Sequence, residues 1–266
     1  MTNEPSIHLT QWGNSGPTVV MVHGSVQGSL LTGDRHFAAQ ERLAARGWKI
    51  VVPDRPGHGR SPSPGRPDDG VLDGHWVAKL LGDGAHLVGH SFGGLVALCA
   101  AAERPEAVRS LTLIEPAIHQ LAAEDPVVAA FFKRQVAIFT SGKPPAEILA
   151  DFSEAAGIPS SLRSERSDPE EARRVGESLL TVRFPTIAEM RELVAKVAEA
   201  KLPVLIVSGG WNPAFDKSAS IVASQIGGRH RIVKSPDHFP QLASDEFNDV
   251  LDGFMRDADA AAARRQ

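Results

Sequence analysis

The sequence has little of what several classes of protein require. It contains one cysteine, Cys99, so no disulfide can form within the chain. No run of 18 apolar residues occurs, and residues 1–10 lack the charged and then apolar pattern of a secretory signal. We therefore expect a soluble, cytoplasmic protein with no membrane partner, in which Cys99 is a small core residue.

An excess of basic residues and the patterns of metal sites are also missing. The 28 Lys and Arg residues are outnumbered by 32 Asp and Glu residues, which gives a net charge of −4. Without a basic stripe to neutralise phosphates, nucleic acid is not an expected partner. The sequence has no H-E-x-x-H pattern, no clustered Cys and His spacing and no glycine-rich phosphate loop, so neither a metal nor a cofactor is expected.

What the sequence does contain is an alternation of short apolar runs with helical patterns. Continuous apolar runs separated by helices predict a mostly parallel sheet covered by helices on both faces, an α/β fold. Strands are expected at 7–12, 18–22, 50–53, 85–88, 110–114, 203–207 and 229–233, and helices at 35–46, 72–81, 95–103, 217–226 and 247–256. Residues 257–266 are rich in Ala and charge and are expected to fray.

The alternation breaks between residues 116 and 202. This stretch shows only helical patterns, near 127–139, 145–156, 169–182 and 187–200, joined by segments rich in Pro, Ser and Gly. It is expected either to form a helical insertion or to add core helices to one face of the sheet. In both cases it lies close to the carboxyl ends of the strands, where ligands bind in such sheets.

One motif carries the chemistry. Residues 89–93 read Gly-His-Ser-Phe-Gly, a G-x-S-x-G pattern placed between an expected strand and an expected helix. A serine on a sharp strand-to-helix turn takes a strained backbone, and its neighbours two positions away must have almost no side chain. The pattern predicts that Ser91 is a nucleophile.

This motif and three further patterns in the same order resemble the α/β-hydrolase superfamily, from about residue 7 to about residue 256. The further patterns are His23-Gly24-Ser25 after the second strand, the D-x-x-G-x-G-x-S loop at 54–61, and His238 after the last strand. The resemblance implies a hydrolase core formed by residues 1–119 and 201–266. It also implies that 120–200 is an inserted helical cap.

A serine nucleophile needs a base within hydrogen-bond reach. His238 lies where the family places its base, and the order of serine, then acid, then histidine matches the family as well. Among the other histidines, His23, His58 and His90 are expected to support neighbouring loops.

The acid departs from the commonest pattern. Relatives usually carry an aspartate in the turn after the strand at 204–207, and here Asn212 stands in that turn. Glu115 closes the strand at 111–114 and precedes a proline, so we expect it to be held extended at the strand end and to point into the cleft. The prediction is Glu115, with Asp216 and, less favoured, Asp237 as alternatives.

The remaining site residues follow from these positions. The oxyanion hole is predicted from the backbone N–H groups of Phe92 and Ser25, and the Ser25 hydroxyl is a third candidate donor. Aromatic residues that either line an apolar substrate site or pack between cap and core are Trp76, Phe131, Phe132, Phe139 and Trp211.

The function predicted from these residues is serine hydrolysis of a small or medium apolar carboxylic ester or lactone through an acyl-enzyme. Carbon–carbon bond hydrolysis, acyl transfer and cofactor-free peroxidase activity use the same residues and stay open as alternatives. A ligand-binding receptor built on the same fold is the alternative from another class. A homodimer is compatible with each of these functions.

Overall fold

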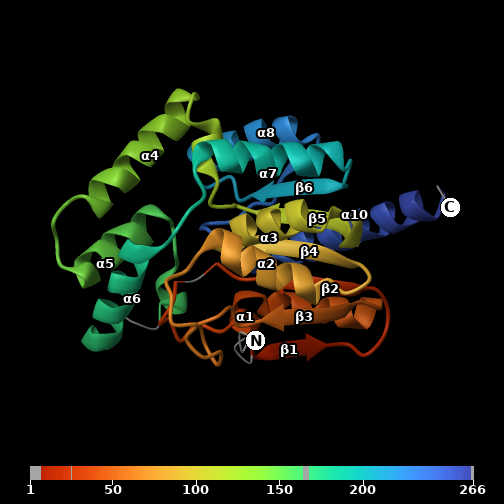
Figure 1. The fold of residues 1–266 in the computed structure, drawn as a ribbon, viewed down its shortest axis with the longest axis horizontal. Helices are drawn as coiled ribbons and strands as arrows, with labels where there is room; N and C mark the ends of the chain where they lie inside the picture. Colours follow the sequence, from red (N-terminus) through yellow and green to blue (C-terminus); the bar gives the residue numbers. More distant parts are fainter. Residues whose placement is uncertain (1–6, 25, 164–167, 265–266) are drawn as a thin grey trace.

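The computed structural model describes residues 7–24, 26–163 and 168–264 and contains one sheet of seven strands (Figure 1). The strands lie in the order β1-β3-β2-β4-β5-β6-β7. β1 runs antiparallel to β3, and all other neighbouring strands pair in parallel. The bounds are β1 (Leu9–Trp12), β2 (Thr18–Val22), β3 (Lys49–Pro53), β4 (Ala85–His90), β5 (Val108–Ile114), β6 (Val204–Ser208) and β7 (Arg229–Ile232).

Helices cover both faces of this sheet, which confirms the predicted fold class. Neighbouring strand residues point to opposite faces, so Leu87 and Val88 of β4 belong to two different apolar clusters. The cluster of Leu87 includes α2 (Gly70–Leu80), α3 (Phe92–Glu103), α7 (Ile187–Glu199) and α8 (Pro213–Ile226). The cluster of Val88 includes the 3-10 helix η1 (Ala38–Arg46) and α10 (Asp245–Ala263).

Three helices lie at one end of the sheet, on the left in Figure 1: α4 (Pro126–Phe139), α5 (Pro145–Ala155) and α6 (Pro169–Thr181). We call residues 126–181 the cap. Within the stretch 120–200 that the sequence assigned to a cap, α7 packs against α3 and α8 and places Val194 and Val197 in the core. The short elements are α1 (Gly33–His36), η2 (Pro105–Ala107), η3 (His119–Ala122), η4 (Ser160–Leu162) and α9 (Pro240–Ala243).

The helix expected at 35–46 is not a continuous α-helix. Only α1 is α-helical there, and the following nine residues form η1. Phe37 interrupts the helix with a φ of −122°. Its side chain is fully buried in the core, so tertiary packing overrides the local helical pattern at this residue.

The expected fraying of residues 257–266 is wrong for its first part, because α10 continues through Ala263. Ala258 is buried against the core, and Asp259 forms an ion pair of 2.7 Å with Arg109 at the start of β5. The composition of this segment does not reveal these contacts with distant parts of the chain. In the described part of the chain, no helix combines the length and the apolar character needed to cross a membrane.

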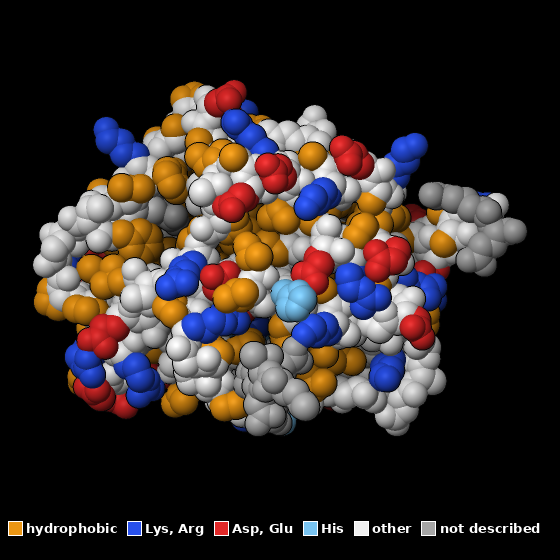
Figure 2. Space-filling model, viewed as in Figure 1, with side chains coloured by type: hydrophobic (Ala, Val, Ile, Leu, Met, Phe, Trp, Pro, Cys, Tyr) orange, Lys and Arg blue, Asp and Glu red, His pale blue; other side chains and the backbone are white. Residues whose placement is uncertain are grey.

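Charged side chains of both signs are interspersed over the face shown in Figure 2. Apolar side chains lie between them and gather on the side of the molecule formed by the cap. On the described part of this face, the basic side chains are separated by acidic and apolar ones.

A buried cluster of charges fixes the loop that follows β3. The Nη1 atom of Arg55 lies 2.8 Å from Asp68 and 2.7 Å from Asp73, and none of the three side chains is more than 1% exposed. Arg55 Nε also donates to the carbonyl oxygen of His23, at the end of β2, over 3.0 Å. The cluster thereby holds the segment after β2 in place, next to the turn that carries Ser91.

Replacing Arg55 should destabilise the protein strongly, because the buried carboxylates of Asp68 and Asp73 would lose the cation that they share, which leaves Asp73 with Arg66 and Asp68 with the N–H of Gln27. We expect Arg55→Met to lower the free energy of unfolding by about 3–5 kcal/mol, measured by urea unfolding. The control is Arg42→Met, which removes an exposed pair with Asp245 and should cost less than about 1 kcal/mol. Equal losses for the two variants would contradict the importance of the buried cluster.

Candidate active site

Ser91 stands at the turn from β4 to α3 in a strained backbone, with φ 55° and ψ −123°. Positive φ is costly for a residue with a side chain and persists only where the surroundings hold it. The N–H of Ser91 donates to the carbonyl of Ile114 over 2.9 Å, and its own carbonyl accepts from the N–H of Ala117 over 3.0 Å. The end of β5 therefore clamps the turn, and Ser91 lines a cavity.

Close backbone contacts explain the glycines around this serine. A Cβ on Gly89 would lie 2.3 Å from the carbonyl oxygen of Gly93, and one on Gly93 would lie 2.2 Å from that of Val22. A Cβ on Gly24 would lie 2.5 Å from the Cβ of Ser91. Because such approaches are too short for any side chain, these positions require glycine.

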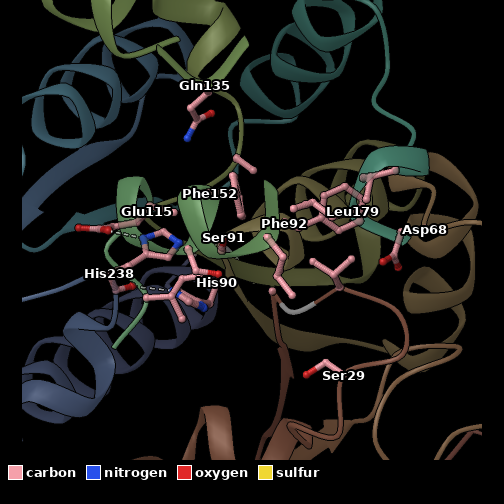
Figure 3. Close-up of a pocket in the computed structure, with 18 of the residues that line it drawn as sticks. Ser29, Asp68, His90, Ser91, Phe92, Glu115, Gln135, Phe152, Leu179 and His238 are labelled. Atoms are coloured by element: carbon pink, nitrogen blue, oxygen red, sulfur yellow. Dashed lines mark hydrogen bonds and ion pairs between the residues drawn. The ribbon is translucent and has the colours of Figure 1, made fainter. Parts of the chain in front are cut away.

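His238 and Glu115 form a buried pair beside Ser91 (Figure 3). The Nδ1 atom of His238 lies 2.6 Å from Oε2 of Glu115, although 123 positions separate the two residues in the chain. This bond occupies Nδ1 and leaves Nε2 of the imidazole for another partner. All three residues line the same cavity, so the structure brings together the predicted nucleophile, base and acid.

The backbone of Glu115 differs from the expected extended form, because its φ is 40°. The N–H of Glu115 still continues the sheet by donating to the carbonyl of Val207 over 2.8 Å. The chain then turns so that Ala117 reaches the carbonyl of Ser91. Pro116 disfavours the right-handed helical region for Glu115. The positive φ that Glu115 takes instead is costly for a residue with a side chain, and the hydrogen bonds of this segment to Val207 and Ser91 hold it.

Burial and hydrogen bonding act on Glu115 in opposite directions. Burial is the largest effect and raises the pKa of the Glu115 carboxyl to about 8, although the hydrogen bonds donated by Gly209 and Trp211 act to lower it by stabilising the carboxylate. Burial lowers the pKa of the His238 imidazole below its usual range. The imidazole is therefore neutral and able to accept a proton, and the donors around Glu115 favour the ionised carboxylate that would stabilise an imidazolium.

The alternative acids have other partners. Asp216 accepts hydrogen bonds from the hydroxyl of Ser208 over 2.5 Å and from the N–H of Gly210 over 3.2 Å. Asp237 accepts from the N–H of Phe239 over 2.9 Å. Asn212, in the turn where relatives usually carry the acid, caps the start of α8 by accepting from the N–H of Ala214.

The first predicted donor of the oxyanion hole lies at the start of α3. Phe92 is the first residue of α3, where backbone N–H groups have no acceptor within the helix. The second donor was predicted on the segment after β2, and Gly24 places this segment directly against Ser91. Ser25 itself lies outside the described residues.

Three further histidines contact loops of the site, as the sequence led us to expect. His23 Nε2 accepts from the N–H of Arg55 over 2.8 Å, and His58 Nε2 lies 3.1 Å from the guanidinium of Arg55. His90 Nε2 donates to the carbonyl oxygen of His238 over 2.8 Å and so helps to hold the loop of the base. Across the described residues, no group of three or more His, Cys, Asp or Glu side chains is arranged to hold a metal ion.

The cavity in front of Ser91 has a volume of about 460 Å³. α4 contributes a stripe of side chains at helical spacing, and α5 and α6 supply apolar side chains farther into the cap. The cap residues of this lining include Phe132, Gln135, Val136, Phe139, Leu149, Phe152, Val175 and Leu179. The lining agrees with a substrate that carries an apolar group of moderate size.

The five predicted pocket aromatics divide into two groups. Phe132 and Phe139 line the cavity, whereas Trp76, Phe131 and Trp211 do not, so that of the two roles the sequence left open the substrate contact is wrong for these three. Trp76 packs against the core cluster beside α3, and Phe131 packs against Ala214 and Phe215 of α8. The indole N–H of Trp211 donates a hydrogen bond to the carboxylate of Glu115.

Sequence reasoning missed the lining residues of α5 and α6. Leu149 and Phe152 are three residues apart, and Val175 and Leu179 are four apart, so each pair lies on one helix face. That spacing predicts an apolar face on each helix. It does not reveal whether the face covers a cavity or solid core.

Ser91, Glu115 and His238 follow β4, β5 and β7 of the parallel sheet, and their order along the chain, serine, then acid, then histidine, is that of α/β hydrolases. A model described as the alpha/beta hydrolase family matches residues 19–250. The chain therefore belongs to the alpha/beta hydrolase family.

Two curated relatives match part of the chain. Lipase LipV of Mycobacterium tuberculosis is 40% identical over 121 residues, which cover 42% of this chain and 42% of the lipase. The 2-hydroxy-6-oxononadienedioate/2-hydroxy-6-oxononatrienedioate hydrolase of Cupriavidus pinatubonensis is 35% identical over 119 residues, covering 41% of this chain and 39% of that enzyme. The matches thus span about two fifths of these relatives.

The fold is shared over a longer stretch with solved structures. The N-acyl homoserine lactone degrading enzyme Est816 superposes with a TM-score of 0.64 over 96% of this chain and 98% of that chain, at 20% identity. At this identity the likeness establishes the fold alone.

The Glu115–His238 pair can be tested without any substrate. In Glu115→Gln the imidazolium loses the carboxylate bonded to its Nδ1, so that only Asp237 still opposes the effect of burial, and the pKa of His238 should fall by at least about one unit. NMR titration of the ring resonances, assigned by their loss in His238→Gln, measures this shift. Asp216→Asn should move the His238 midpoint much less. An unchanged or higher midpoint in Glu115→Gln would show that the carboxylate does not act on His238.

Proposed function

We propose that this chain is a serine hydrolase that cleaves a small or medium apolar carboxylic ester or lactone through an acyl-enzyme. The observation that carries the proposal is the 2.6 Å hydrogen bond between Glu115 and His238 at the floor of the cavity that Ser91 lines. A buried carboxylate on Nδ1 fixes the tautomer of the imidazole and stabilises the cation that forms during proton transfer.

The reaction begins when Ser91 Oγ attacks the carbonyl carbon while His238 Nε2 takes its proton. The tetrahedral intermediate places a negative oxygen near the N–H of Phe92, the first donor of α3. His238 then returns the proton to the leaving oxygen, and the carbon–oxygen bond breaks to give the acyl-enzyme. A water molecule, deprotonated by His238, releases the acid by the same steps. In a lactone the leaving oxygen remains attached to the acyl chain.

The cavity supports the substrate class. Its cap side is lined by aliphatic and aromatic side chains, among them Phe139, Leu149 and Leu179. Apolar surface contributes about 25 cal/mol per Å² when it is removed from water, so an acyl or alcohol group with several methylenes gains most from this lining. The similarity to a lipase and the fold shared with a lactone-degrading enzyme support the same class.

A second candidate is hydrolysis of a carbon–carbon bond in an unsaturated oxo acid. It rests on the 35% identity to the 2-hydroxy-6-oxononadienedioate/2-hydroxy-6-oxononatrienedioate hydrolase. A panel of p-nitrophenyl esters of graded chain length, lactones and a dienoic oxo acid separates the two candidates. Turnover of the oxo acid with no ester or lactone turnover would replace the proposal by the second candidate.

The catalytic roles predict a clear order among three variants. Ser91→Ala should lower kcat by about 10⁴-fold or more, and Glu115→Gln should lower it by several orders of magnitude, because the imidazolium loses its counter-charge. Asp216→Asn should cost little. Steady-state assays on the best ester, with circular dichroism to verify folding, measure these effects. A Ser91→Ala variant with a tenth of the wild-type activity would end the serine-hydrolase proposal.

Two adjacent phenylalanines test the cavity as the substrate site. Phe132 lines the cavity, so Phe132→Ala should shift the preferred acyl length, because it enlarges the space for the chain. Phe131 packs against Phe215 with ring centroids 5.2 Å apart, so Phe131→Ala should lower stability by about 3–5 kcal/mol without changing the length preference. The ester panel and thermal unfolding measure both. The same length profile in both variants would contradict this assignment.

A further inference from the structure

The loop after β6 surrounds the carboxylate of Glu115 with hydrogen-bond donors. The N–H of Gly209 donates to Oε1 over 2.7 Å. The indole Nε1–H of Trp211 lies 2.9 Å from Oε1 and 3.1 Å from Oε2, so it is shared between the two oxygens. His238 occupies Oε2 from the other side. The loop that carries the acid in most relatives here supplies donors to an acid from the neighbouring strand.

Trp211 has a defined place in this arrangement. Its ring packs at 5.1 Å from the ring of Phe215, in the apolar cluster of Phe131 and Ala214. The cavity lining does not include it. Its polar atom is therefore directed to the acid and its apolar ring to α8, with no contact to the space for substrate.

One glycine of the cap, Gly157, bonds to His238 and lies against Trp211, the residue that donates to Glu115. Gly157 follows α5 with a φ of +67°, and its carbonyl oxygen accepts the N–H of His238 over 3.1 Å. A Cβ on Gly157 would lie 2.5 Å from Cη2 of the Trp211 ring. A side chain at 157 would thus collide with the residue that bonds to Glu115, on a backbone that already disfavours side chains.

We propose that Trp211 and Gly157 are positioning residues of the triad, through which the docked end of cap helix α5 holds Glu115 and His238 in their working geometry. This inference rests on the proposed hydrolase function. Neither residue contacts substrate in this role. Trp211 holds both carboxylate oxygens of Glu115 through its indole N–H. Gly157 leaves room for the indole and holds the backbone N–H of His238 through its carbonyl oxygen. The cap then contributes to catalysis as well as to the shape of the cavity.

Charge explains why the indole matters. Glu115 is buried, and the carboxylates of Asp216 and Asp237 face it with the same sign, so all three conditions favour a protonated acid. Opposing them are the Gly209 N–H, the Trp211 N–H and the contact with His238. Without the indole donor, the Glu115 carboxylate should take up a proton at higher pH, and a protonated acid cannot stabilise the imidazolium.

The first test compares two tryptophans. Trp211→Phe keeps an aromatic ring against Phe215 and removes the N–H. We expect kcat to fall about ten-fold or more with KM nearly unchanged, and the acid limb of the kcat profile to move up by about one pH unit, as for loss of one hydrogen bond to a charged group. Trp48→Phe is the matched control, because the buried Trp48 also donates through Nε1 to a carboxylate, that of the partly exposed Asp252, over 2.6 Å at a site far from Ser91 in the fold.

The second test compares two glycines of the cap. Gly157→Ala should lower kcat and move the pH profile in the same direction as Trp211→Phe, because the new methyl group displaces the indole. Gly142→Ala places a side chain on a similar left-handed backbone, φ +73°, with no heavy atom within 4 Å of the new Cβ. Gly142→Ala should therefore lower the melting temperature to a similar extent as Gly157→Ala, and it should keep the wild-type kcat. Matching kinetics for the two tryptophan variants, or for the two glycine variants, would overturn the proposal.

A readout independent of turnover separates this inference from the proposed function. Labelling of wild-type Ser91 by a fluorophosphonate, absent in Ser91→Ala, tests the function itself. The downfield NMR resonance of the proton between His238 and Glu115 tests the positioning, and it should vanish in Glu115→Gln. Trp211→Phe and Gly157→Ala should shift it, and both controls should leave it in place. A resonance unmoved in all four variants would overturn the inference whether or not the wild type is labelled.

Discussion

The hydrogen bond between Glu115 and His238 sets the demands that the surrounding structure meets. A carboxylate buried at the carboxyl end of β5 would take up a proton unless donors replace the lost water. Gly209, Trp211 and His238 provide those donors from three positions along the chain. The left-handed turn at Glu115 also lets the chain return to the carbonyl of Ser91. The same short segment therefore positions the acid and clamps the nucleophile.

The nucleophile turn could be predicted from sequence because its constraint is local. Gly89 and Gly93 lie two residues from Ser91, and both contacts that exclude a side chain involve the strand-to-helix turn itself or the adjacent end of β2. Most strand and helix positions followed in the same way, since apolar periodicity reports burial along one element. His238 could be located because the order of elements, which the sequence does display, decides where the base lies.

What the sequence could not predict depends on contacts between distant residues. Trp211 and Glu115 are 96 positions apart, and no local pattern shows that an indole bonds to the acid instead of lining the substrate site. Phe131 and Phe132 differ by one position, which turns a side chain by about 100° around a helix. One consequently faces α8 and the other the cavity. The break of the helix at Phe37 likewise follows from burial of that ring.

Moving the acid to β5 also gives a physical reason for the asparagine after β6. Asn212 caps α8 through its side-chain oxygen, and an aspartate would cap the helix equally well. An aspartate at position 212 would, however, add a further negative charge to this region. The charges of Asp216 and Asp237 already disfavour ionisation of Glu115. The neutral amide of Asn212 keeps the hydrogen bond at the start of α8 without adding to that repulsion. With the acid at the end of β5, hydrogen-bond donors and a neutral Asn212 in this loop stabilise the Glu115 carboxylate more than a second carboxylate would.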